Sequence, residues 1–303
     1  MRPRVLVLLA AYNGEKYIRE QIESVLAQEG DFDLTVRVRD DGSSDGTARI
    51  VRELAAEHPG RIELIQGENV GYNANFFTLL DGASGCDYYA LCDHDDKWMP
   101  DKIAAALRML EKEDGPALYA CTSVMTDAAL HPTGETRRQQ RPFTLANTLI
   151  QNICPGHNQV LNDALLKIVQ KPRDVSQIYV YDLWIANLAV LYGKICFDNT
   201  PHTLYRQHGS NELGSEGSRL GKLIKAGRRA MSGEGGKNKK QMAYFAGLHR
   251  EELTEQGLYG SVRELLEADS FGRRLRFTAH CPFYRQSRLE TLAFRDAVLV
   301  GKY

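Results

Sequence analysis

Residues 88–98 read Tyr-Tyr-Ala-Leu-Cys-Asp-His-Asp-Asp-Lys-Trp, a short apolar run that ends in an acidic cluster. The run from Tyr88 to Cys92 has the length and composition of a buried β-strand. Asp93, Asp95 and Asp96 follow within four residues, and such carboxylates repel one another unless a cation or solvent lies between them. Because oxygen ligands suit Mg²⁺ or Mn²⁺, the stretch predicts a strand that leads into a metal-binding loop. A solvated acidic loop is the alternative.

Strands and helices alternate through residues 1–125. The apolar run 5–10 predicts a first strand, and apolar residues from Ile18 to Leu26 repeat at the spacing of one helix face. Such alternation predicts an α/β fold with a mostly parallel central sheet flanked by helices. Further strands are expected near 34–38, 62–65, 88–92 and 117–122, with helices near 45–58, 76–80, 100–112 and 182–191.

The start of the chain allows a second interpretation. Met1 to Arg4 and the apolar residues behind them resemble the charged and apolar parts of a signal peptide. The run leads directly into the turn Asn13-Gly14 and an amphipathic segment, which favours a buried strand.

The bulk composition describes an ordinary globular protein. The chain has 303 residues, is 43% hydrophobic and carries a formal charge of −1, which provides no general attraction for nucleic acid. Its six cysteines lie far apart without a Cys-x-x-Cys pair, as expected of reduced thiols in a cytoplasm. No apolar run reaches the roughly 18 residues that span a bilayer.

Three polar segments follow predicted strands: 10–14 (Ala-Ala-Tyr-Asn-Gly), 40–47 (Asp-Asp-Gly-Ser-Ser-Asp-Gly-Thr) and 93–98. Ligands of open α/β sheets bind at the carboxyl ends of the strands, so these segments should meet at one edge. The segment from Asp41 also matches the first half of a calcium-binding EF-hand loop, but Arg52 stands where a bidentate Glu is required. A plain Gly, Ser and Asp turn is the alternative there.

The composition changes after about residue 215. Basic residues crowd around a Gly-rich segment, 233–236, which we interpret as a linker, and helical patterns resume behind it. Such a cluster is either a solvated surface or a site of peripheral membrane contact through 219–240. The basic residues are Arg219, Lys222, Lys225, Arg228, Arg229, Lys237, Lys239 and Lys240.

Together, the segments 10–14, 40–47 and 92–98 resemble the family 2 glycosyltransferases of the GT-A fold, and the resemblance continues through Asn69-Val70-Gly71 to about residue 215. Residues 93–98, 181–184 and 205–211 look most like the bacterial rhamnosyltransferase subgroup, which more often has Gln at the position of His94 and His at the position of Tyr181. The resemblance implies a GT-A domain over 1–214, with a nucleotide-sugar half (1–125) and an acceptor half (126–214), and a C-terminal helical extension over 215–303.

The resemblance also implies roles for particular residues. A dTDP- or UDP-sugar would be held by Ala10, Tyr12, Asn13, Asp41, Asp93 and Arg206, with Tyr12 near the base and Asp41 accepting from its imide. Mn²⁺ or Mg²⁺ would be bound by Asp95, Asp93 and His208, with Asp96 as a supporting group.

Asp182 is the candidate general base of an inverting transfer, in which a carboxylate takes the proton of the acceptor hydroxyl. Alternatively, Asp182 is placed there only because a carboxylate at the N-terminus of a helix is stabilised by the helix macrodipole. Trp184 is a core residue or an acceptor-stacking residue.

The implied function is transfer of a sugar, with L-rhamnose from dTDP-rhamnose as the first choice and glucose or galactose from a UDP-sugar as an alternative. The acceptor would be a polysaccharide or lipid-linked glycan of the cell surface or cell wall. The reaction would occur in the cytoplasm or on the cytoplasmic face of the membrane.

Three other classes compete. A haloacid-dehalogenase-type phosphohydrolase also has Asp-x-Asp after a buried strand, but it expects Thr or Val at the position of Lys97. A sugar nucleotidyltransferase would need a Gly-rich phosphate loop in place of residues 11–14. A catalytically silent carbohydrate-binding module would retain the fold alone.

Overall fold

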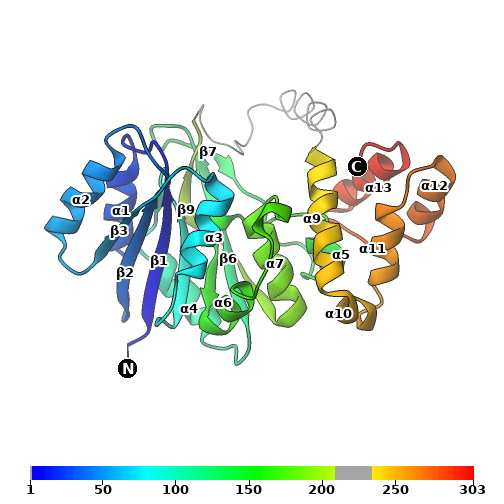
Figure 1. Cartoon of the computed structure of the whole chain (residues 1–303), viewed down its shortest axis with the longest axis horizontal. Helices are drawn as coiled ribbons and strands as arrows, with labels where there is room; N and C mark the ends of the chain where they lie inside the picture. Colours follow the sequence, from blue (N-terminus) through cyan, green and yellow to red (C-terminus); the bar gives the residue numbers. More distant parts are fainter. Residues whose placement is uncertain (1, 209–233) are drawn as a thin grey trace.

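A single mixed sheet organises the first two thirds of the chain (Figure 1). The computed structural model describes residues 2–208 and 234–303, so most of the basic segment 219–240 lies outside the described residues. Within the described residues the sheet has nine strands in the order β3-β2-β1-β4-β8-β6-β9-β5, with β7 paired to β6. The structure confirms the predicted α/β class.

The first half of the sheet is parallel. β1 (Arg4–Ala11) lies between β2 (Asp33–Asp40) and β4 (Tyr88–Asp93), and β2 also pairs with β3 (Ile62–Gln66). In this register Ala11 lies opposite Asp40, and Ala10 lies opposite Asp93. The three polar segments therefore meet at one edge, as the sequence predicts.

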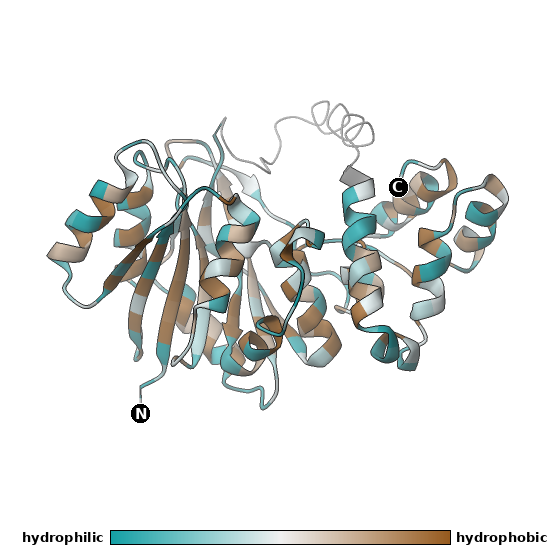
Figure 2. Cartoon of the chain, in the orientation of Figure 1, coloured by the Kyte–Doolittle hydropathy of each residue, from teal (hydrophilic) through white to brown (hydrophobic). Residues whose placement is uncertain are grey.

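Alternate residues of β1 enter two separate cores. Val5, Val7 and Leu9 pack with α1 (Ile18–Leu26), α2 (Thr47–Glu57) and α4 (Lys102–Leu110). Leu6, Leu8 and Ala10 pack with α3 (Tyr72–Asp81), α6 (Asp163–Val169) and α7 (Tyr181–Tyr192) on the other face. A strand buried on both faces is apolar throughout, which is why residues 5–10 show no alternation. Figure 2 shows this apolar character along the central strands.

The second half of the sheet is mixed. β6 (Ala117–Thr126) runs parallel to β9 (Lys194–Arg206), whereas β8 (Val160–Asn162) is antiparallel to both β4 and β6. The short β5 (Lys97–Trp98) pairs antiparallel with β9, and β7 (Pro132–Glu135) pairs antiparallel with β6. The end of β9 is thereby brought beside the acidic loop. Short helices α5 (Leu145–Thr148), η1 (Gly156–Asn158) and η2 (Val175–Gln177) occupy the connections.

Five helices follow the gap in the described residues. They are α9 (Glu234–Leu248), α10 (Arg250–Glu255), α11 (Tyr259–Leu266), α12 (Phe271–His280) and α13 (Arg288–Leu299). α9 begins inside the expected Gly-rich linker, because burial of Met242, Phe245 and Ala246 outweighs the poor helix propensity of glycine.

The C-terminal helices share the core on the α7 face of the sheet. Trp184 of α7 stacks on Tyr244 of α9 with ring centroids 5.6 Å apart and meets Phe245 edge-on. Trp184 is therefore a core residue. No helix among the described residues is both long and apolar enough to cross a membrane.

Candidate active site

A cleft of about 1660 Å³ lies along the carboxyl edge of the sheet. Its walls come from the loops after β1, β2 and β4, from η1 and α7, and from the C-terminal helices. Of the nine predicted site residues, Arg206 alone does not line it. The other eight are Ala10, Tyr12, Asn13, Asp41, Asp93, Asp95, Asp182 and His208.

The loops after β1 and β2 are fastened together at one end of this cleft. The backbone N–H of Asn13 donates to Ser43 Oγ (2.8 Å), and the backbone N–H of Ser44 donates to Asn13 Oδ1 (2.9 Å). Asn13 adopts a left-handed φ of 47°, which Asn tolerates better than most residues. Tyr12 lies beside this junction and is 47% exposed, so its ring is available to a planar ligand.

Asp41 is buried beneath the same end of the cleft. Its carboxylate pairs with Arg39 and accepts from the backbone N–H groups of Val70 (3.0 Å) and Gly71 (2.9 Å). A carboxylate offers about four lone-pair positions, so these contacts orient Asp41 and leave capacity for one further donor.

Asp95 meets the end of β9 through His208. His208 Nε2 lies 2.8 Å from Asp95 Oδ2, and the imidazole stacks on Tyr17 with centroids 5.0 Å apart. The side chains of Asp95 and His208 are each only 13% exposed. The structure thus brings together two of the three residues expected to hold a metal.

Arg206 lies under the acidic loop, away from the cleft lining. Its backbone N–H donates to Asp96 Oδ1 (3.0 Å), its Nε donates to the carbonyl of Asp95 (2.8 Å), and its guanidinium also contacts Ala128 and Glu20. These contacts fix the loop, so the structure favours a positioning role for Arg206 over the expected contact with the donor.

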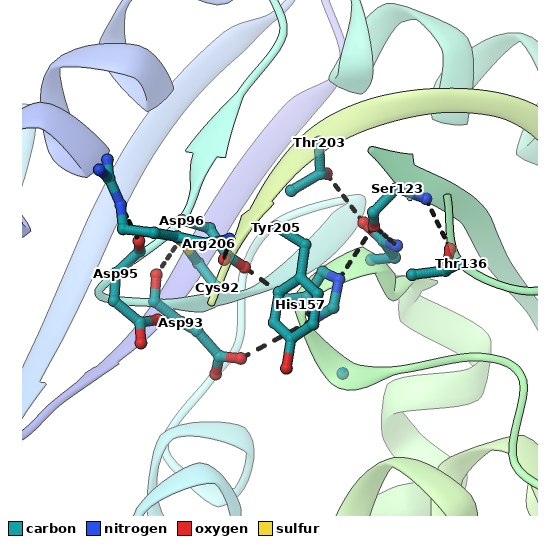
Figure 3. Close-up of polar contacts among 12 residues, drawn as sticks. Cys92, Asp93, Asp95, Asp96, Ser123, Thr136, His157, Thr203, Tyr205 and Arg206 are labelled. Atoms are coloured by element: carbon teal, nitrogen blue, oxygen red, sulfur yellow. Dashed lines mark hydrogen bonds and ion pairs between the residues drawn. The ribbon is translucent and has the colours of Figure 1, made fainter. Parts of the chain in front are cut away.

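A further histidine faces the acidic loop (Figure 3). His157 Nδ1 lies 3.9 Å from carboxylate oxygens of both Asp93 and Asp96. Its Nε2 is 3.0 Å from Ser123 Oγ, and its ring stacks on Tyr205 with centroids 4.6 Å apart. Burial lowers the pKa of His157 to about 3, so the imidazole is neutral.

Asp96 is the most constrained of the carboxylates. It is fully buried, and burial raises its pKa well above the usual range, with Asp95 and Asp93 adding to the effect. Its Oδ2 has no hydrogen-bond partner among the residues that the structure describes.

A divalent cation fits this arrangement. Ligand atoms of Asp93, Asp96 and His157 all lie within 4.8 Å of one another, and Asp95 of the same loop contacts His208, which follows β9. Carboxylate oxygens with one or two imidazole nitrogens suit Mn²⁺, and carboxylates alone suit Mg²⁺. The sequence did not identify His157, because it lies in a loop without a metal-ligand spacing and only the fold brings it to β4.

Asp182 lies across the cleft, in the first turn of α7. Its carboxylate accepts from the backbone N–H groups of Gly156 (3.0 Å) and Leu183 (2.7 Å). Burial raises its pKa to about 6, and the hydrogen bonds, including one from Asn152, oppose that rise. A carboxylate of this pKa is ionised at neutral pH and still binds a proton readily, which suits a general base.

Lys102 of α4 holds the loop that carries His157, a function that the sequence did not indicate. Its buried Nζ donates to the carbonyl of His157 (2.6 Å) and to Thr203 Oγ1 (2.9 Å), and it lies 4.0 Å from the ring centroid of Trp98. Burial lowers its pKa. Lys102 therefore joins α4, η1 and β9 behind the acidic loop.

Replacing Lys102 with methionine keeps the apolar stem and removes the donors. The variant Lys102→Met should lose roughly 1–3 kcal/mol of unfolding free energy for each buried acceptor left without a partner. Chemical denaturation followed by circular dichroism measures this loss. The exposed Lys112→Met is the matched control, and equal stability of the two variants would show that Lys102 does not fasten the site.

Comparison with known proteins identifies the family. The model of the family described as "Glycosyl transferase family 2" matches residues 6–167, just over half of the chain. The chain therefore belongs to this family, which removes the phosphohydrolase alternative.

Two curated relatives illustrate the range of similarity. The dTDP-rhamnosyl transferase RfbG of Shigella flexneri is 27% identical over 219 residues, which cover 68% of this chain and 74% of the relative. An uncharacterized protein of Mycobacterium tuberculosis is 37% identical over 108 residues, which cover 35% of this chain. The matched region spans about a third (31%) of that protein's length.

Solved structures share the fold. TarS 1–349 of S. aureus in complex with UDP-GlcNAc superimposes with a TM-score of 0.57 at 17% identity, covering 100% of this chain and 89% of that one. The mannosyltransferase PcManGT of Pyrobaculum calidifontis, in complex with GDP-Man and Mn²⁺, gives a TM-score of 0.54 at 18% identity and covers 100% and 86%. These likenesses support the predicted GT-A fold.

Proposed function

We propose that the chain transfers a sugar from a nucleotide diphosphate donor to a hydroxyl of a polysaccharide or lipid-linked glycan, with inversion at the anomeric carbon. The observation that carries the proposal is the cleft itself, which has Asp41, Asp93 and Asp95 on the sheet side and Asp182 on α7. The six cysteines are free thiols, which suits action in the cytoplasm or at its membrane face.

The nucleotide would bind at the end formed by the loops after β1 and β2. Tyr12 supplies an exposed ring for stacking, and the Asp41 carboxylate accepts the imide N–H of uracil or thymine. Ala10 and Asn13 form the adjoining floor. Because the partners of Asp41 fix its orientation, little order has to be imposed when the base binds.

The donor diphosphate would lie against the acidic loop. Asp93, Asp95 and His208 would hold Mn²⁺ or Mg²⁺ there, with Asp96 and His157 as supporting groups. When bound, the cation would offset the negative charge that builds on the leaving diphosphate. The Mn²⁺ in the PcManGT complex supports this assignment.

The acceptor hydroxyl would attack from the Asp182 side. Its oxygen forms the bond to the anomeric carbon as the bond to the diphosphate oxygen breaks, and Asp182 takes the hydroxyl proton. The sugar passes through an oxocarbenium-like state, as in glycoside hydrolysis, without a covalent sugar intermediate.

We infer that the donor is dTDP-rhamnose, and the similarity to RfbG along two thirds of the chain supports this. His94, the main departure from the subgroup pattern, packs over Gly14, where an added β-carbon would come within 2.4 Å of its ring. His94 therefore belongs to the junction of two cleft loops.

A donor screen tests the proposed substrate. With Mn²⁺, we expect nucleotide release to be fastest with dTDP-rhamnose and slower with UDP-glucose, UDP-galactose and GDP-mannose. Preference for a UDP-hexose would replace the rhamnose assignment with the alternative. The absence of turnover with every donor, with or without Mn²⁺, would favour the silent carbohydrate-binding module.

Removal of one carboxylate tests the diphosphate site. Asp95→Asn should lower metal-dependent turnover on the order of 100-fold or more, because it weakens both the cation site and the contact with His208. The exposed Asp114→Asn is the matched control. Near-normal turnover of Asp95→Asn across a Mn²⁺ titration would refute the ligand role.

The proposed base is tested by charge removal and by pH. Asp182→Asn should lose roughly 10²–10⁴-fold in transfer and retain donor binding. In the wild-type protein the rate should fall as the pH drops below about 6, where Asp182 becomes protonated. Asp163→Asn, at the N-terminus of α6, is the control for a purely helix-terminal carboxylate.

Stability separates this effect from misfolding. The pKa of Asp182 is about 6 in the folded protein and near 4 in an unfolded chain. The folded state therefore binds the proton more tightly, and stability declines as the pH rises from about 4 to about 6. Asp182→Asn removes this cost but turns an amide NH2 toward one of the two backbone N–H donors, so the two effects offset and the variant should unfold near the wild-type temperature at pH 7.5. An equal loss of transfer in Asp163→Asn would contradict the assignment of Asp182 as base.

A further inference from the structure

The outward face of α13 carries exposed apolar residues, with the exposed Asp296 between them, and nothing among the described residues covers it. Leu289, Leu292 and Val300 are 80%, 56% and 61% exposed, while Phe294 and Val298 are buried on the opposite side. A helix with apolar residues on both sides normally lies between two partners, and contiguous exposed apolar surface marks an interaction site.

α12 carries a second stripe of exposed apolar residues. Phe271 and Leu275 are spaced one helical turn apart and are 62% and 51% exposed. α12 packs against α13, and both helices lie at the end of the molecule opposite α2 (Figure 1). We call Phe271, Leu275, Arg288, Leu289, Leu292 and Val300 the α12–α13 surface.

The charge of residues 271–303 indicates the kind of partner that this surface binds. Residues 271–303 contain seven Lys and Arg against two Asp and Glu, a net charge of +5 in a chain whose total is −1. Of the two acidic residues, Glu290 pairs with Arg137, and Asp296 is exposed. Arg273 pairs with Asp269 and Lys302 lines the cleft, but the remaining arginines beside exposed apolar residues match the anionic headgroups and acyl boundary of a phospholipid bilayer.

A pocket beside α13 has the side chains of a phosphate-binding site. It has a volume of about 370 Å³ and is lined by Arg141, Arg288 and Arg295 together with Tyr284 and Leu292, with no carboxylate among its described lining residues. The Arg141 guanidinium lies 4.0 Å from the centroid of the Tyr284 ring, which orients it. Cationic and apolar groups thus adjoin, as lipid headgroups and chains do.

We propose that the α12–α13 surface docks on a bilayer of anionic phospholipid. The exposed leucines, Phe271 and Val300 enter the headgroup boundary, and the arginines of the pocket contact lipid phosphates. This surface is distinct from the basic segment 219–240. Ala297 of α13 and Lys302, just after the helix, also line the cleft, so docking would hold the cleft at the lipid surface, a consequence that rests on the proposed transfer to a lipid-linked acceptor.

Vesicle co-sedimentation of the full chain tests the docking. The protein should sediment with vesicles of equal parts phosphatidylcholine and phosphatidylglycerol, remain in solution with phosphatidylcholine alone, and be released as salt rises. Arg288→Glu should weaken binding on the order of fivefold or more. Leu289→Asp combined with Leu292→Asp should abolish it.

Matched controls use exposed residues elsewhere. Leu248→Asp and Arg108→Glu should bind like wild type, and circular dichroism should show that all variants fold. Equal sedimentation with neutral and anionic vesicles, or none with either, would overturn the proposal. So would a dimer in light scattering that the double leucine variant converts to a monomer, since a second copy would then cover the face. Donor turnover without acceptor, measured on the same variants, tests the proposed chemistry separately.

Discussion

Electrostatic repulsion among Asp93, Asp95 and Asp96 is the constraint on which the site depends. The fold accommodates it by giving each carboxylate a different neighbour. Asp95 meets His208, Asp96 is buried and accepts from the backbone of Arg206, and Asp93 faces the cleft near His157. The groups that contact these carboxylates come from the end of β9 and from η1, so both halves of the sheet contribute to the acidic loop.

The elements that the sequence predicts correctly are those defined by a local run of apolar residues. Residues 5–10 and 88–92 are continuous apolar strands, and strand order then places the loops that follow them at one edge. β9 was missed because Asp198, Asn199 and Thr200 interrupt its apolar pattern, and its pairing with β6 shifts register there. β8 has only three residues, too few for a periodicity.

The roles of residues that act through long-range contacts also could not be predicted from the local sequence. Lys102 reads as part of an ordinary amphipathic helix, yet it is buried with its ammonium on the His157 carbonyl. His157 reaches Asp93 and Asp96 only because η1 packs beside β4. Arg206 had been expected in the cleft from the surrounding motif, but its contacts with Asp95 and Asp96 direct it beneath the loop. Tertiary contact rather than sequence spacing defines these roles.

In the proposed reaction the two sides of the cleft have different tasks, with the nucleotide diphosphate on the sheet side and proton transfer on α7. The sheet side is the more decisive, because without a metal-dependent diphosphate site the remaining assignments lose their basis. Titration calorimetry of dTDP into the protein, with Mn²⁺ and then with a chelator, tests it most directly. We expect binding that requires Mn²⁺ and is weakened in Asp95→Asn. Binding of equal strength in chelator, unchanged by Asp95→Asn, would contradict it.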